Sequence, residues 1–310
     1  MVGEVRREVV ALDLGGTWIR AARFSPTGKI GKRARDRTAA HLGPAAVVEQ
    51  IRDLVETVGP ADPGARVVAI GVPGPVDPFT GVVEGAPNLP GWGAFPLKDR
   101  VEAEVGSPCL VDHDATLAAL GEHRQGAGRG FRNFVYVTVS TGIGAGLCLD
   151  GKLFRGGQGK AGEFGHIVVD PDGPPCHCGN RGCLEALSSG TAIAALAGLP
   201  SAAAVSRAAQ EGDEEAAKVL AQAAWHLGVA VGGSLINLLN PDAIAFGGGV
   251  FAAGPAFWDQ MTAGVAHGSF RAPREHCRLL RAELGEDQGL VGAFELAMDA
   301  GPVGTTPAGV

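Results

Sequence analysis

The strongest constraint on the fold is a pattern of strand, glycine turn and strand that occurs twice in the chain. The first copy consists of Val9–Leu14, Gly15, Gly16 and Trp18–Phe24. The second copy consists of Phe134–Val139, the glycine-rich segment Ser140–Gly146, and Leu147–Leu149. Predicted helices and strands alternate after each copy, so we expect a duplicated α/β protein.

Apolar periodicity predicts the remaining elements and, with them, two lobes. The predicted helices are Pro44–Val58, Leu97–Val105, Ala115–Gln125, Glu214–Leu239 and Gly289–Asp299. The further predicted strands are Arg66–Val72, Cys109–Val111 and Ala243–Phe246. We expect residues 1–115 and the C-terminal helix 288–300 to form a small lobe, and 116–287 a large one. The Gly-, Pro- and Thr-rich tail 301–310 is expected to be disordered.

Composition excludes several functional classes. The 310 residues are 45% apolar, which is enough for two buried cores. The net charge of −7, from 26 basic and 33 acidic residues, gives no attraction to nucleic acid or an anionic membrane. A single tyrosine offers no aromatic platform for stacking bases. An apolar run long enough to span a membrane and a signal peptide are both missing, which predicts a cytoplasmic location.

The first glycine turn, Asp13–Thr17, has the chemistry of a magnesium–phosphate site. Its carboxylate ends an apolar strand, its two glycines allow a ligand to approach the backbone, and Thr17 adds a hydroxyl. It is not a Walker loop, since the lysine and the spacing are missing. Taken alone, a tight hairpin with a solvated Asp13 explains it equally well.

The second glycine segment, Ser140–Gly146, follows a strand but leads into another strand, Leu147–Leu149. A dinucleotide fingerprint must open a helix, so that interpretation is disfavoured. The alternative is an ordinary glycine-rich hairpin. Because the segment is paired with Asp13–Thr17, phosphate binding is the better hypothesis, with two turns that hold a polyphosphate from opposite sides.

A cluster of cysteines predicts a metal site. Cys176, Cys178 and Cys183 fall within eight positions, and in a reducing compartment this spacing indicates zinc rather than a disulfide. Zinc requires a fourth ligand, for which His166 is the best candidate, while His177 is expected to point elsewhere. Buried, reduced cysteines are the alternative, which the intervening glycines disfavour. Four protein ligands would make the zinc structural.

Asp114 follows His113 where a predicted strand meets a predicted helix. An aspartate in this position is most often a helix N-cap, and the motif alone favours that role.

Together these motifs resemble the ROK family of bacterial sugar kinases and sugar-responsive repressors. The segments that carry the resemblance are Asp13–Thr17, Val111–Ala115, Ser140–Gly146, Glu163–His166, the cysteine cluster with Glu185, and Gly247–Gly249. The resemblance extends from about Val9 to Glu295, nearly the whole chain. Asn88–Trp92 and Ser189–Thr191 add similarity to the family's glucokinases. The resemblance implies a duplicated actin/hexokinase-like α/β fold with an interlobe cleft.

The resemblance also implies an activity and a role for each site residue. We expect ATP-dependent phosphorylation of the 6-hydroxyl of a free hexose, most of all glucose, with Mg²⁺ and a structural Zn²⁺. Asp114 would be the catalytic base. Sugar contacts would come from Asn88, His113, Asp114, Glu163, His166 and Glu185. ATP contacts would come from Asp13, Gly15, Gly16, Thr17, Thr141, Gly142, Gly248 and Gly249. Zinc would be bound by His166, Cys176, Cys178 and Cys183.

Two departures from the family pattern leave alternatives open. His113 replaces the usual asparagine before the catalytic aspartate, and Trp18 replaces the usual lysine or asparagine. The preferred hexose could therefore be N-acetylmannosamine, N-acetylglucosamine, mannose or fructose, and polyphosphate remains a conceivable second donor. A sugar-sensing regulator is less expected, since about a dozen residues before Asp13 are too few for a helix-turn-helix. A zinc protein with vestigial phosphate turns is disfavoured by Asp114 and Glu163. The family implies a homodimer or homotetramer.

Overall fold

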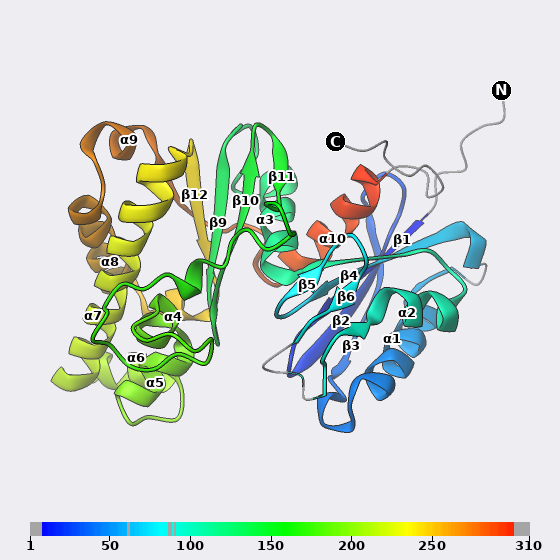
Figure 1. Ribbon diagram of the computed structural model, residues 1–310, viewed down its shortest axis with the longest axis horizontal. Coiled ribbons are helices and arrows are strands. Elements are labelled where there is room, and N and C mark those ends of the chain that lie inside the picture. Colours follow the sequence, from blue (N-terminus) through cyan, green and yellow to red (C-terminus); the bar gives the residue numbers. More distant parts are fainter. Residues whose placement is uncertain (1–7, 61–62, 86–88, 90, 301–310) are drawn as a thin grey trace. The chain divides into compact units, whose positions relative to one another are not determined.

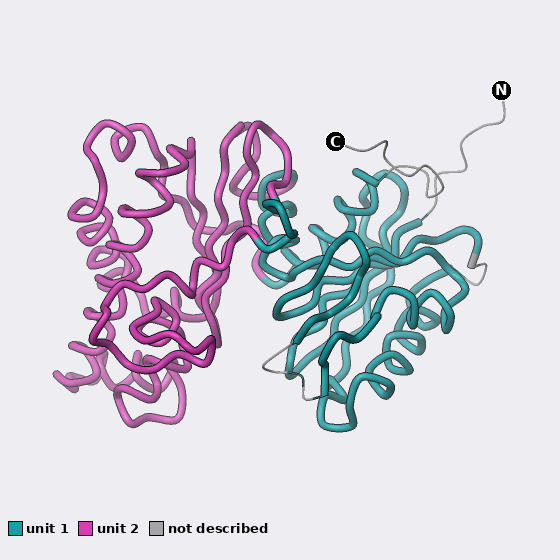
Figure 2. Tube along the Cα trace, in the orientation of Figure 1, with its two compact units in different colours: residues 1–124, 155–160, 286–310 teal, residues 125–154, 161–285 magenta. Residues whose placement is uncertain are grey.

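Two structural units divide the chain (Figure 2). Unit 1 contains residues 1–124, 155–160 and 286–310, and unit 2 contains residues 125–154 and 161–285. The computed structural model describes residues 8–60, 63–85, 89 and 91–300. The tail 301–310, which is predicted to be disordered, and Asn88, a predicted sugar contact, lie outside the described residues.

Unit 1 is built on a five-stranded sheet with the order β3-β2-β1-β4-β8 (Figure 1). Its strands are β1 (Glu8–Leu14), β2 (Trp18–Phe24), β3 (Ile30–Arg37), β4 (Arg66–Val72) and β8 (Cys109–His113). β1, β2 and β3 form antiparallel pairs, whereas β4 is parallel to both β1 and β8. The carboxyl ends of β1, β4 and β8 therefore lie at one edge of the sheet.

Helices cover this sheet in unit 1. They are α1 (Pro44–Val58), α2 (Leu97–Val105), α3 (Asp114–Gln125) and α10 (Gln288–Asp299). The apolar positions predicted to form one face of α1 are all buried, which confirms that helix. α10 packs on β1 and β4, and its Phe294 ring stacks on Phe24 at 4.9 Å. A small sheet of β5 (Val76–Asp77), β6 (Val82–Val83) and β7 (Phe95–Pro96) completes the unit.

Unit 2 repeats the same sheet, with the order β11-β10-β9-β12-β13 (Figure 1). Its strands are β9 (Phe134–Val139), β10 (Ile143–Leu149), β11 (Lys152–Phe154), β12 (Ala243–Gly247) and β13 (Arg278–Arg281). Three of its strands form antiparallel pairs and β12 lies parallel to β9 and β13, as in unit 1. The predicted duplication is therefore confirmed strand by strand.

Six α-helices and one π-helical segment are described in unit 2. They are α4 (Leu184–Ser188), α5 (Gly190–Leu196), α6 (Ala202–Gln210), α7 (Glu214–Ala230), α8 (Pro255–Gly268), α9 (Arg271–His276) and the π-helical segment Val231–Leu239 that continues α7. α7 and α8 pack so closely that a Cβ on Gly264 would lie 2.6 Å from the Trp225 carbonyl oxygen. The continuous helix Glu214–Leu239 is long and apolar enough to cross a membrane by length and composition alone. Half of its most apolar window is buried inside the structure.

The structure corrects the second glycine segment and adds strands. Gly144 and Gly146 lie inside β10, so the turn is only Ser140–Gly142. β3 and β13 escaped prediction because their sequences, IGKRARDR and RLLR, lack an extended apolar or alternating pattern. Both are edge strands, which need few buried side chains.

Candidate active site

Two carboxylates come together at the carboxyl edge of the unit 1 sheet. Asp13 is one residue from the end of β1, and Asp114 follows β8 directly. β4 lies between these strands, and its Gly71 pairs with both Asp13 and Asp112. A Cβ on Gly71 would lie 3.6 Å from the Cα of Asp114, so glycine allows the start of α3 to approach the sheet closely.

Of the two carboxyl groups at this edge, that of Asp13 has a strongly raised pKa. Its pKa is raised to about 6, mainly by burial and also by the charge of Asp114, while Arg20 opposes both effects. The Arg20 Nη1 atom lies 3.3 Å from Asp13 Oδ2. Gly289 of α10 also lies against Asp13, because a Cβ at this glycine would be 3.0 Å from the Asp13 carboxyl carbon. A desolvated carboxylate beside a glycine turn is a suitable ligand for hydrated Mg²⁺, so the donor set fits that ion.

The first glycine turn is braced by the neighbouring strand. Gly15 donates its N–H to the Trp18 carbonyl at 2.9 Å. Thr38, just after β3, donates its hydroxyl to the Gly15 carbonyl at 2.6 Å and its N–H to the Thr17 carbonyl at 3.0 Å. The Trp18 ring lies between two guanidinium groups, 5.3 Å from Arg35 and 5.1 Å from Arg37. These cation–π contacts give Trp18 a structural role where the family usually has lysine or asparagine.

Asp114 opens α3 with an accessible carboxylate. Its side chain is 41% exposed, and Oδ1 accepts the Ala115 N–H at 2.6 Å. The Nδ1 atom of His113 lies 3.6 Å from the same oxygen. Asp112, only 1% exposed, accepts the His113 N–H at 2.8 Å and the Arg155 Nε–H at 2.9 Å. The Arg155 Nη2 atom forms an ion pair with it at 2.8 Å. Asp112 and Arg155 position this segment, and sequence reasoning missed both because their pairing spans 43 residues.

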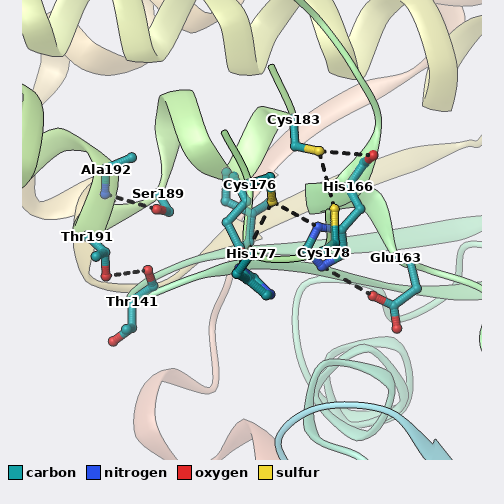
Figure 3. Close-up of polar contacts among 12 residues, drawn as sticks. Thr141, Glu163, His166, Cys176, His177, Cys178, Cys183, Ser189, Thr191 and Ala192 are labelled. Atoms are coloured by element: carbon teal, nitrogen blue, oxygen red, sulfur yellow. Dashed lines mark hydrogen bonds and ion pairs between the residues drawn. The ribbon is translucent and has the colours of Figure 1, made fainter. Parts of the chain in front are cut away.

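The turn Ser140–Gly142, which we call the β9–β10 turn, is held by the segment 185–191 of unit 2. Glu185 Oε2 accepts the N–H of Ile143 at 2.7 Å. The Gly190 N–H donates to the Ser140 carbonyl at 2.7 Å. The Thr191 hydroxyl donates to the Thr141 carbonyl at 2.9 Å (Figure 3). Thr141 and Gly142, two predicted phosphate contacts, therefore lie beside Glu185, a predicted sugar contact.

The predicted metal ligands form one cluster. Figure 3 shows the sulfur atoms of Cys176, Cys178 and Cys183 gathered around His166. The Cys178 and Cys183 Sγ atoms are 3.6 Å apart, and Cys176 Sγ is 3.7 Å from His166 Nδ1. Ligands of a tetrahedral zinc with Zn–S bonds of about 2.3 Å are separated by about 3.8 Å. The four residues therefore fit zinc.

The thiol pKa values differ within this cluster. Burial raises the pKa of Cys183 to about 12, while hydrogen bonding from the Asn180 N–H lowers the pKa of Cys178. A bound cation would favour the thiolate form of both residues.

Two histidines within residues 163–183, the segment that we call the cysteine loop, approach carboxylates. The second ring nitrogen of His166, Nε2, lies 3.9 Å from Glu163 Oε2. His177, which was expected to point away from the ligands, has its Nδ1 3.4 Å from Glu185 Oε1 and 4.0 Å from Cys176 Sγ. The two imidazole rings meet edge to face at 5.1 Å. Three predicted sugar contacts, Glu163, His166 and Glu185, therefore lie together with His177, to which the sequence analysis assigned no site role.

A cavity of about 230 Å³ lies beside the third glycine motif in unit 2. α6 lines it with Ser206, Arg207 and Gln210, and the segment 249–253 closes the opposite side. Gly248 has φ +96°, and a Cβ there would lie 2.2 Å from the Val139 carbonyl oxygen, so only glycine fits. Of the two predicted adenosine contacts, Gly249 lines this cavity and Gly248 precedes it in the chain.

The family model described as the ROK family matches residues 9–300. The chain belongs to the ROK family. The sequence prediction of the family is thereby confirmed. Its mixed α/β architecture, with two sheets of the same topology, is the actin/hexokinase-like fold predicted from the sequence.

Among the similar proteins of this family are several named as sugar kinases. A glucokinase of Halalkalibacterium halodurans is 35% identical over 310 aligned residues, covering 92% of this chain and 93% of the relative. An N-acetylmannosamine kinase of Salmonella typhimurium is 35% identical over 293 residues, covering 93% and 97%. The solved structure of a Streptomyces griseus ROK glucokinase, in complex with glucose and AMPPNP, is 34% identical with a TM-score of 0.80. That alignment covers 94% of this chain and 99% of the other.

Proposed function

We propose that this ROK protein is an ATP-dependent hexose kinase that converts glucose to glucose 6-phosphate. The observation that carries the kinase assignment is the pair of carboxylates at one sheet edge, with the Asp13 side chain 20% exposed and that of Asp114 41% exposed. Phosphoryl transfer needs one group to organise the metal–phosphate and another to accept the proton of the attacking hydroxyl. Glucose is the proposed substrate because glucokinases are among the full-length relatives.

In unit 1, Asp114 is proposed as the general base. It accepts the proton of the sugar 6-hydroxyl as that oxygen bonds to the γ-phosphorus of ATP and the bond to ADP breaks. The preceding residue, His113, is proposed to contact the sugar and to take no part in the proton transfer. Asp13 would hold hydrated Mg²⁺, with Gly15, Gly16 and Thr17 beside the phosphates. The ion neutralises charge that develops on the phosphate oxygens.

In unit 2, the residues are proposed to bind rather than to transfer protons. Glu163, His166 and Glu185 would form hydrogen bonds with sugar hydroxyls, and Asn88, which belongs to unit 1, is proposed as a further sugar contact. A zinc ion bound by His166 and the three cysteines would fix the orientation of that imidazole. The phosphates would be contacted by Thr141 and Gly142, and the adenosine by Gly248 and Gly249.

N-acetylmannosamine is the main alternative to glucose as the substrate. It is favoured by the full-length relative with that kinase activity in its name and by His113, which replaces an asparagine that usually contacts the sugar. The proposal also includes a cytoplasmic location and a homodimer or homotetramer, both implied by the family.

A panel of hexoses with ATP and Mg²⁺ tests this function. The panel contains glucose, mannose, fructose, N-acetylglucosamine and N-acetylmannosamine, and the measurement is kcat/KM with ADP release as the readout. We expect glucose to give the highest value. A higher value for N-acetylmannosamine would replace the substrate and keep the kinase, whereas no turnover with any sugar would contradict the kinase itself.

A further inference from the structure

The carboxylate of Glu185 contacts two different parts of unit 2 at once. Its Oε2 atom accepts the Ile143 N–H at 2.7 Å, where the β9–β10 turn enters β10. Its Oε1 atom lies 3.4 Å from Nδ1 of His177 in the cysteine loop. The side chain is only 17% exposed, and its two carboxylate oxygens join the turn to the loop.

The β9–β10 turn is also packed tightly between the residues that flank the metal cluster. A Cβ on Gly142 would lie 2.5 Å from Glu185 Oε2. A Cβ on Gly165 would lie 2.4 Å from the Ile143 carbonyl oxygen and 3.3 Å from the Glu185 Cβ. Glycines at both positions therefore allow Glu185 and the loop around Gly165 to close on the turn from two directions.

The residues that contact the turn, Gly165 and Glu185, lie close in sequence to proposed zinc ligands. Gly165 immediately precedes His166, and Glu185 follows Cys183 by two residues. His177 lies between Cys176 and Cys178. A change in the conformation of the cysteine loop therefore displaces the groups that hold the turn, because no flexible linker separates them.

We propose that Glu185, oriented by His177, positions the β9–β10 turn, so that the cysteine loop controls binding of the phosphate donor as well as binding of the sugar. The inference rests on the proposed function, in which this turn contacts ATP phosphates. It gives Glu185 a role as a positioning residue in addition to its proposed sugar contact. It also assigns a role to His177, which the family resemblance leaves without one.

The test compares three variants of the full chain. Glu185→Ala removes both contacts, His177→Ala removes only the orienting group, and His41→Ala is a matched control at an exposed histidine of unit 1. Three quantities are measured: the zinc content per chain, amide hydrogen exchange at Ile143, and the Kd for AMPPNP by calorimetry without sugar. A hydrogen bond to a charged group contributes enough to expect about a tenfold weaker Kd for Glu185→Ala.

The expected pattern separates positioning from loss of the metal. His177→Ala should keep its zinc, exchange Ile143 faster than the wild type, and bind AMPPNP about threefold to fivefold more weakly, while His41→Ala changes none of these. Replacement of Glu185 by glutamine should partly restore protection, since an amide oxygen can still accept the Ile143 N–H. The inference is overturned if Ile143 exchange and the AMPPNP Kd stay at wild-type values in Glu185→Ala.

The same measurements distinguish the inference from the proposed function. Binding of AMPPNP and exchange at Ile143 are independent of turnover. If the protein phosphorylates no hexose but shows the expected changes, the proposed function is wrong and the role of Glu185 in positioning the turn is supported. If the protein phosphorylates glucose and Glu185→Ala weakens only glucose binding, the proposed function is supported and the positioning role is wrong.

Discussion

The two glycine turns occupy equivalent positions in the two sheets but are supported differently. Each connects the first antiparallel strands of a duplicated sheet. In unit 1 the turn follows its own carboxylate, Asp13, and is braced by Thr38 from the adjacent edge strand. In unit 2 the described turn contains no acid, and Glu185 reaches it from a helix that follows the cysteine loop.

This difference shows how duplication can separate two tasks. The turn of unit 1 is held by hydrogen bonds to Trp18 and Thr38 of the same unit. Unit 1 also contains Asp13 and Asp114, for which we propose the roles of metal ligand and general base. The turn of unit 2 depends on a loop whose conformation depends on four proposed metal ligands. We therefore expect perturbation of the metal to affect the turn of unit 2 and to leave that of unit 1 intact.

Removal of zinc should have the largest effect and should be confined to unit 2. Structural zinc sites contribute on the order of 10 kcal/mol in small peptides, but here the hydrophobic core of unit 2 remains. We expect about one zinc per chain, its loss in Cys178→Ser, and faster amide exchange in residues 163–191 with unchanged exchange in β1 and β2. Elemental analysis and hydrogen exchange measure this; protein purified without chelators that contains no zinc would refute the site.

Substitution of Asp114 should give the next largest effect and should be confined to catalysis. Asparagine preserves helix capping but cannot accept a proton, so Asp114→Asn should lower kcat by roughly 10²–10⁴-fold. The melting temperature should stay close to that of the wild type, and glucose should still bind. Thermal melting and steady-state kinetics on one preparation test this. A variant with near-normal kcat would remove Asp114 from the mechanism, and Glu163 would be the next carboxylate to examine.

Much of this architecture was readable from local patterns. Pro44–Val58 and Arg66–Val72 were predicted with the bounds that the structure gives, because each has a strong apolar periodicity between clear breakers. The cysteine cluster was predicted because its spacing alone brings the sulfur atoms together.

Contacts between distant residues could not be read in the same way. Arg155 pairs with Asp112 and Glu185 bonds to Ile143 across more than forty residues, and one sequence contains no signal for such partners. β3 was missed because it carries mostly charged residues on a sheet edge. The raised pKa of Asp13 depends on the burial and charge supplied by α10, β2 and α3, which only the folded chain brings together.

The pKa of Asp13 predicts a pH dependence that originates in unit 1. Its pKa of about 6 is higher than the ordinary value of 3.8, so the folded state binds more protons between these pH values. Stability should therefore fall as pH rises from 4 to 6, by roughly 2 kcal/mol once the partial exposure of the side chain is considered. Asp13→Asn should remove this decline in urea unfolding without Mg²⁺ or ATP.

Arg20→Met sharpens that prediction. Arg20 opposes the upward shift, so its loss should raise the pKa of Asp13 and move the decline to higher pH. If the pH dependence of Asp13→Asn matches that of the wild type, the decline originates elsewhere in the chain.

The smallest expected effect comes from a methyl group added to either turn. In Gly142→Ala the new Cβ meets Glu185 Oε2 at 2.5 Å, and this flexible carboxylate can move away at the cost of its bond to the Ile143 N–H. In Gly15→Ala the Cβ meets the Trp18 carbonyl oxygen at 3.0 Å, within the backbone of the same turn.

We expect Gly142→Ala to weaken AMPPNP binding by about 1 kcal/mol, roughly fivefold. In the Glu185→Ala background that loss should largely disappear, whereas the effect of Gly15→Ala should add to Glu185→Ala without coupling. Additivity at both glycines would mean that the two turns are supported alike, because the penalty at Gly142 would then not pass through Glu185.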